Sequence, residues 1–135
     1  MAVTPRHQGL VANTHNITIY GSFRPNGTGS ITVKNGKGFS VARSNVGEYT
    51  LTFDQTFADF ISAQATMSIA TSDTDAHLVR MGDRSVANKT IDIVHLAASD
   101  TAAAHLAKAD IASAADNWIS FEVTLALVDI PGAGI

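Results

Sequence analysis

Side chains able to act as acids, bases or nucleophiles are present but scattered through this sequence. His77, His95, Asp83 and Asp92 are the groups that could orient a base beside one of the many Ser or Thr hydroxyls. Nucleophilic catalysis needs such a hydroxyl, a base in contact with it and a third group that orients the base. No Gly-x-Ser-x-Gly elbow or comparable local signature brings these residues together. The sequence therefore predicts no catalytic residue and a protein that is not an enzyme.

The most metal-like spacing is Asp73-Thr74-Asp75-Ala76-His77. In an extended segment, alternation would project Asp73, Asp75 and His77 to one side as three potential ligands. The alternative is an Asp-rich turn in which both carboxylates bond to backbone amides. The segment lacks the glycine and the terminal glutamate of an EF-hand loop. We expect the turn and predict neither a cofactor nor a metal, although binding by these three residues stays open.

Other polar motifs favour structural roles. His95 is in line with Ile91 and Ile93, which predicts a hydrogen-bonded histidine in the core or in an interface. The glycine-rich stretches 27–30 and 36–38 resemble phosphate loops only faintly. No predicted helix follows either stretch, so the helix dipole that phosphate binding uses would be missing. We interpret both as turns between strands.

Two aromatic residues stand on the polar side of their predicted strands. Tyr20 and Trp118 each alternate with an apolar face, so either another segment of the chain covers them or a partner does. His7 and His15 lie in the N-terminal arm, where they are solvated or make pH-sensitive contacts. Tyr20, Trp118, His7 and His15 are therefore the predicted interface residues.

The composition indicates one domain with little surface charge. The chain has 135 residues, of which 45% are hydrophobic and only 16% are charged, with a net charge of −3 and no cysteine. The scattered Lys and Arg residues form no basic stripe, which argues against direct binding of nucleic acid. The N-terminus lacks the apolar core of a signal peptide, and no window is long and apolar enough to span a bilayer. We expect a soluble chain made inside the cell that does not bind membranes.

Alternation with a period of two dominates the chain and predicts an all-β fold. Strands are expected from Ile17, at Ile31 and Val33, at Phe39 and Val41, from Tyr49 to Phe53, from Ala63 to Ile69, from His77 to Met81 with an end at Gly82-Asp83, from Ile91 to His95, and from Asn117 to Asp129. Asn35-Gly36 predicts a hairpin between the second and third strands.

These strands, turn signals about every ten residues and a long closing strand predict an antiparallel β-sandwich of jelly-roll type. The predicted division is an extended N-terminal arm over 1–16, a sandwich domain over 17–129 and a C-terminal tail over 130–135. The alanine-rich segment near 100–114 has two alternatives, a short helix that carries Leu106 and Ile111 or irregular chain.

The loose arm, the hairpin-rich stretch GSF…GKGFSVARSNVGEYTLTF, the short Asp-rich loop and the closing strand NWISFEVTLALVD resemble the capsid decoration, or cement, proteins of tailed bacteriophages. The resemblance extends over roughly residues 17–129. It implies a non-enzymatic virion protein, made in the host cytoplasm, that binds the capsid exterior as a homodimer or homotrimer. Its partner would be the major capsid protein, and its role would be to bridge neighbouring copies of that protein.

Two other functions compete with this hypothesis. One is another virion component, such as a tail, fibre or receptor- and carbohydrate-binding β-sandwich module, which would use exposed aromatics such as Trp118. The other is a small β-sandwich enzyme that uses His77, Asp83 and His95. Sugar titration separates the first of these from a decoration protein, and alanine substitutions separate the second.

Overall fold

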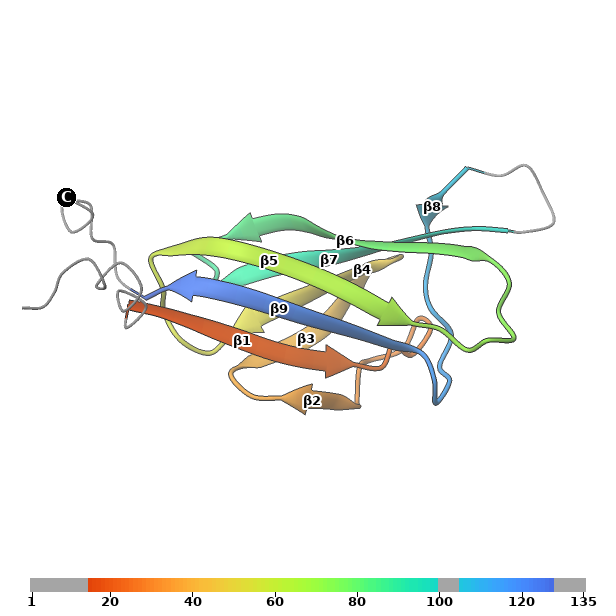
Figure 1. The fold of residues 1–135 in the computed structure, drawn as a ribbon, viewed down its shortest axis with the longest axis horizontal. Coiled ribbons are helices and arrows are strands. Elements are labelled where there is room, and N and C mark those ends of the chain that lie inside the picture. The colour runs from red at the N-terminus through yellow and green to blue at the C-terminus, as the bar shows by residue number, and fades with distance from the viewer. Residues whose placement is uncertain (1–14, 100–104, 128–135) are drawn as a thin grey trace, which may run out of the picture.

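The computed structural model describes residues 15–99 and 105–127 of the chain, and this part consists of strands, turns and loops. Within these residues, no helix lies between the strands (Figure 1). They are β1 (Asn16–Phe23), β2 (Lys34–Gly36), β3 (Phe39–Asn45), β4 (Glu48–Phe53), β5 (Asp59–Ser68), β6 (Ala76–Ser85), β7 (Thr90–Ala98), β8 (Ala107–Lys108) and β9 (Trp118–Ala126).

The strands form two antiparallel sheets. The first has the order β2-β1-β9-β5, and the second has the order β3-β4-β7-β6, with the short β8 paired to β7 beyond the start of β4. β9 pairs along its whole length with β1 on one side and β5 on the other, so it is a central strand of the first sheet. The all-β sandwich expected from the sequence is confirmed, whereas the jelly-roll connectivity stays a prediction.

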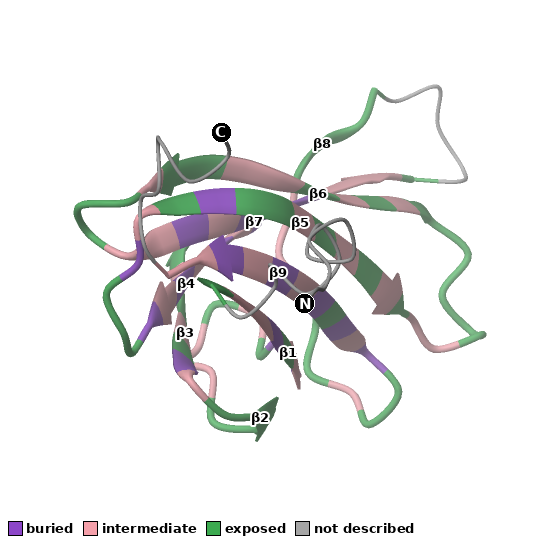
Figure 2. Ribbon diagram, turned by 60° about the vertical axis from the view of Figure 1, so that its left-hand side comes forward, coloured by how far each residue is buried: buried purple, intermediate pink, exposed green. Residues whose placement is uncertain are grey.

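The core lies between the two sheets because alternate side chains of each strand point inward. Figure 2 shows buried and more exposed residues alternating along β4 and β9, as the burial pattern of each strand records. The buried core residues are Ile19, Phe23, Phe39, Tyr49, Leu51, Phe53, Phe57, Phe60, Ile91, Ile93, Ile111, Ile119, Phe121, Val123 and Leu125. Burying each large side chain contributes about 1.5–3 kcal/mol, so this cluster dominates the stability of the sandwich.

The short helix considered for residues 100–114 is wrong for residues 105–114. This stretch contains β8 and extended chain, while residues 100–104 lie outside the described part. Ile111 is buried in the core while Leu106 remains 46% exposed, so the two do not form a common apolar face. The Ile111 carbonyl accepts a hydrogen bond from the Gly27 amide at 2.8 Å. These tertiary contacts override the helix preference of the alanines.

The predicted hairpin at Asn35-Gly36 is also wrong. Both residues lie within β2, which pairs with β1, whereas the following β3 pairs with β4 in the other sheet. The segment 37–38 therefore carries the chain between the two layers. Gly36 has a φ of 114°, and an added Cβ there would lie 2.6 Å from the Tyr20 carbonyl oxygen, so this turn needs glycine for both conformation and space. Ile31 and Val33, expected in the second strand, precede it.

Other strand boundaries also differ from the expected ones, among them the end of β7, which lies at Ala98 and not at His95. β6 does not end at Gly82-Asp83 but passes through an irregularity between Met81 and Arg84 and continues to Ser85. β5 begins at Asp59, before the predicted start. β9 ends at Ala126, so its 9 residues span about 30 Å and stay in one sheet. The predicted arm, apart from His15 and Asn16, and the predicted tail lie outside the described residues.

Candidate binding surface

The outward face of the first sheet carries small polar side chains with very little charge. Three successive rows cross β1, β9 and β5, and Glu122 is the charged residue among them. The rows are Thr18–Thr124–Ser62, Tyr20–Glu122–Gln64 and Ser22–Ser120–Thr66. We call these nine residues the hydroxyl face. Its hydroxyls lie at regular positions because the strand pleat sends every second side chain outward.

Tyr20 is the large residue of the hydroxyl face. Its side chain is 63% exposed, the highest value among the exposed large hydrophobic residues of the described chain. Beside it, the surface between β5 and β9 forms a shallow hollow lined by Gln64, Thr66, Ser120 and Glu122. An exposed aromatic ring next to amide, carboxylate and hydroxyl groups can contribute buried area and directional hydrogen bonds to a partner.

Trp118 lies on the same side of the sheet as Tyr20, opposite Ser68. Its indole Nε1 donates a hydrogen bond to the Ala115 carbonyl at 2.9 Å, and the Arg24 guanidinium lies 5.1 Å from the centre of its ring. Trp118 thus makes contacts within its own chain and is only partly exposed. Tyr20 offers the more accessible aromatic surface.

His15, also predicted for an interface, is exposed directly before β1. Its carbonyl accepts a hydrogen bond from the Leu127 amide at 2.7 Å, which ties the start of β1 to the end of β9. His7 lies outside the described residues. The structure thus places Tyr20 and Trp118 on one face and His15 at the edge where that face begins.

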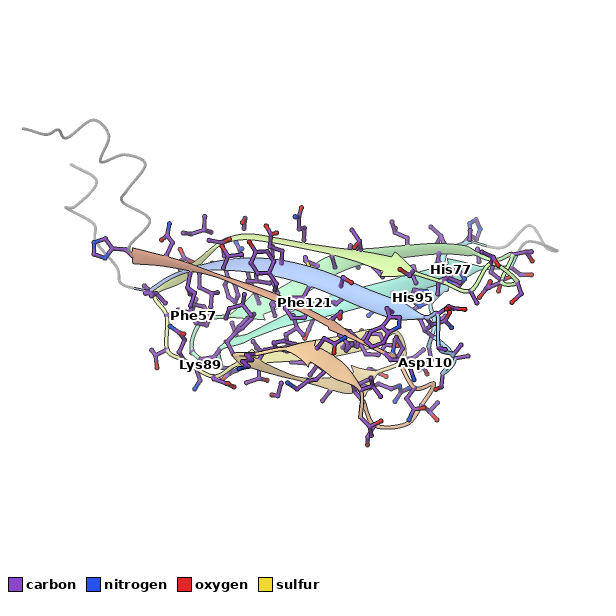
Figure 3. All side chains as sticks on the ribbon, turned by 60° about the horizontal axis from the view of Figure 1, so that its bottom comes forward. Phe57, His77, Lys89, His95, Asp110 and Phe121 are labelled. Carbon is purple, nitrogen blue, oxygen red and sulfur yellow. The ribbon has the colours of Figure 1, made fainter. Side chains whose placement is uncertain are left out.

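A second polar arrangement occupies one end of the sandwich. Figure 3 shows His77, His95 and Asp110 near one another there and far from Phe57 and Lys89. We call these three residues and their hydrogen-bond partners the histidine end. Nδ1 of His77 and Nε2 of His95 are 2.9 Å apart. The other nitrogen of His95, Nδ1, lies 2.5 Å from the Ala109 carbonyl oxygen. The other nitrogen of His77, Nε2, lies 3.1 Å from Oδ1 of Asp73, a contact close enough for an ion pair but not aligned as a hydrogen bond.

The partners of the two rings fix where protons sit. A carbonyl oxygen only accepts, so His95 Nδ1 must carry the proton that binds Ala109. A neutral His95 then presents Nε2 as an acceptor, and His77 Nδ1 must donate to it. Burial, more than any other cause, lowers the pKa of His95, which keeps this fully buried ring neutral. The prediction of a hydrogen-bonded histidine at position 95 is consistent with this geometry.

Asp110 fastens the segment after β8 to the turn between β3 and β4. Its two carboxylate oxygens accept from Nε and Nη2 of Arg43, each at 2.9 Å, and Oδ1 also accepts from the Gly47 amide at 3.0 Å. The Arg43 hydrogen bonds are the largest cause that lowers the pKa of Asp110. Next to this site, Lys108 pairs with Glu48. Arg43, the Gly47 amide and Glu48, all from the stretch 43–48, thus hold residues 108–110 in place.

The Asp-rich segment before β6 forms a turn. Oδ1 of Asp73 accepts from the Asp75 amide at 2.9 Å, as the turn interpretation predicted. The close contact with His77 is the largest cause that lowers the pKa of Asp73. In the described ranges no group of three His, Cys, Asp or Glu side chains could hold a metal ion. Oδ1 of Asp92, another candidate acid, accepts a hydrogen bond from the Thr50 hydroxyl at 2.8 Å.

Comparison with protein-family models finds no matching family, and comparison with curated proteins and with solved structures finds no significant match. Across residues 15–99 and 105–127, no helix is long and apolar enough to cross a membrane. The function must therefore be argued from the surfaces of this molecule.

Sequence reasoning missed the partners that complete the histidine end of the sandwich. Arg43 and Asp110 were not singled out, although they meet in one network with Gly47. The available signal was the turn motif Asn45-Val46-Gly47, whose glycine suits the observed φ of 65°, but nothing near it in the sequence points to Asp110.

Proposed function

We propose that this chain is a non-enzymatic structural protein of a tailed-bacteriophage virion. It binds the outer surface of the capsid, as a dimer or trimer, and stabilises the shell by bridging major capsid proteins. The observation that carries the proposal is the hydroxyl face, in which one charge and one exposed tyrosine occur among nine outward residues. Protein interfaces are depleted in charge at their centre and enriched in tyrosine, so the low charge of the face and its exposed tyrosine favour a protein partner.

The size of the hydroxyl face supports binding in several copies. Three strands about 4.8 Å apart and three rows about 6.7 Å apart give a face of roughly 300 Å². A stable interface buries about 800 Å² on each partner. The face alone therefore forms a weak contact, and repeated contacts through symmetry would raise the overall affinity. A symmetric oligomer on a symmetric shell meets this requirement.

The test uses tailed-phage particles assembled with and without this chain. Sedimentation should recover the protein with the particles in hundreds of copies, and heating should rupture the decorated particles at a higher temperature. A handful of copies per particle, or an unchanged rupture temperature, would contradict the decoration role and favour a tail or fibre component.

A second candidate, a carbohydrate-binding virion module, is favoured by one observation. Tyr20 shares its row with Glu122 and Gln64 beside the shallow hollow, and such a set can stack on a sugar ring while it bonds to hydroxyls. Titration with neutral oligosaccharides, followed by the backbone amide resonances of Gln64 and Glu122, tests it. Saturable shifts that vanish in Tyr20→Ser would support this candidate over decoration.

A further inference from the structure

The His77–His95 contact can hold only a limited number of protons. With both rings neutral, His77 Nδ1 donates to His95 Nε2 across 2.9 Å, and His95 Nδ1 donates to the Ala109 carbonyl. The ring centres lie 5.1 Å apart with the ring planes inclined by 23°, and the two nitrogens that face each other join the rings. One added proton fits on His77 Nε2, where it faces Asp73.

A second added proton has no such position. It must go to His95 Nε2, and two N–H groups would then point at each other across 2.9 Å. Two positive rings would also repel each other in a site where His95 is fully buried. The doubly charged pair is therefore incompatible with the closed geometry.

The surrounding charges do not remove this conflict. The charged groups near the pair are Asp73 from the loop after β5 and Asp110 from the segment after β8. Asp73 lies against the outer nitrogen of His77, on the far side from His95, and Asp110 is engaged by Arg43 of β3. Lys108 and Glu48 neutralise each other at the β4 edge. None of these carboxylates accepts a hydrogen bond from His95 Nε2.

The two rings differ in how firmly they are held. His95 sits on a central strand, its amide donates to the Gly47 carbonyl at 2.7 Å, and its ring is bound to Ala109. His77 lies near the start of β6, an outer strand of its sheet, after a loop in which residues 71–75 are exposed. Opening of the pair therefore displaces His77 and the beginning of β6.

We propose that the His77–His95 pair acts as a pH-dependent latch. The pair holds the start of β6 against β7 while it carries at most one added proton, and it releases β6 when both rings become charged. The latch converts a fall in pH into a local release of residues 73–79 while the rest of the sandwich stays folded. It does not depend on the proposed virion function.

Hydrogen exchange with residue resolution tests the latch, with protection factors compared at pH 7.5 and pH 5. We expect amides 76–79 to lose at least about tenfold in protection relative to amides 119–125 of β9, because opening must precede exchange. In His77→Gln the loss should be absent, since the amide can turn its oxygen towards a protonated His95. The matched control His105→Gln, at an exposed histidine outside the pair, should behave like the wild type.

Imidazole ¹⁵N spectra of the wild type give a second measurement that needs no variant. The pair should take up two protons in separate steps, and the loss of protection in β6 should coincide with the second step. Equal loss in the wild type and in His77→Gln would overturn the proposal. So would a wild type in which both rings become charged while β6 keeps its protection.

Discussion

The hydroxyl face and the histidine end of this sandwich are built in opposite ways. The hydroxyl face comes from the regular alternation of three neighbouring strands, and its side chains make few contacts with one another, such as the 2.9 Å bond between the Thr18 and Thr124 hydroxyls. The histidine end joins loops and strands that are far apart in the sequence through hydrogen bonds with defined donors and acceptors. The comparison indicates that one region is available to partners and that the other maintains the fold.

The largest expected effect is at Gly47, where the close packing of the histidine end leaves no room for a side chain. An added Cβ would lie 2.7 Å from the Ala109 nitrogen and 2.7 Å from the His95 carbonyl oxygen, and the residue has a φ of +65°. Gly47→Ala should lower the free energy of unfolding by about 2–4 kcal/mol, from left-handed strain together with the steric conflict. Urea denaturation measures the loss.

Gly27→Ala is the matched control for this substitution. Gly27 also has a positive φ, of +58°, but nothing lies within 4 Å of the added Cβ. It should lose only about 1–2 kcal/mol, from strain alone. Equal losses at both positions would show that the close approach of residue 109 does not matter.

The next effect is a pH dependence of the free energy of unfolding in two pH ranges, an upper window set by His95 and an acid window set by Asp110. The folded pKa of His95 is lowered from 6.5, so the stability it contributes is complete above pH 6.5 and falls as the pH drops towards the folded value. The folded pKa of Asp110 is lowered from 3.8, so its contribution is present above pH 3.8 and is lost as the pH falls through the folded value.

Denaturation at a series of pH values measures both windows. Each proton that the unfolded chain binds in excess changes the unfolding equilibrium by about tenfold per pH unit. Asp110→Asn should flatten the acid window and leave the upper window in place. An acid window that is as steep in Asp110→Asn as in the wild type would assign it to other carboxylates.

A smaller effect is expected at Lys89, far from the histidine end. It is the non-glycine residue with a positive φ, of 61°, in the described part of the chain. Lys89→Gly should raise the free energy of unfolding by about 0.5 kcal/mol, because relief of left-handed strain exceeds the added freedom of the unfolded chain. Lys37→Gly, at an exposed turn lysine without a positive φ, should bring no gain. A gain of the same size at both positions would argue against strain at Lys89.

The smallest expected change in stability is at the hydroxyl face. Tyr20→Ser should alter the free energy of unfolding by less than about 0.5 kcal/mol, since a largely exposed side chain contributes little to the core. Thermal or urea unfolding checks this value. A loss above 1.5 kcal/mol would mean that the face maintains the fold as the histidine end does.

The contrast also explains what the sequence could and could not predict. Period-two alternation predicted β1, β4, β7 and the inward face of β9, because every second side chain of a half-buried strand must be apolar. It placed Tyr20 and Trp118 on the outward side for the same reason. It failed where local preference and tertiary contact disagree, as at Asn35-Gly36 and in the alanine-rich segment. It could not predict the pairing of Arg43 with Asp110, because 67 residues separate them and no local pattern records the contact.

Co-sedimentation of the wild type and Tyr20→Ser with tailed-phage particles that lack the chain tests the proposed role of the hydroxyl face most directly. We predict that the wild type saturates the particles in hundreds of copies and that Tyr20→Ser, although equally stable, loses most of this binding. Val86→Ser, at a partly exposed turn residue away from the face, should bind as the wild type does. Saturation by Tyr20→Ser with wild-type affinity, or no binding by the wild type, would contradict the proposal.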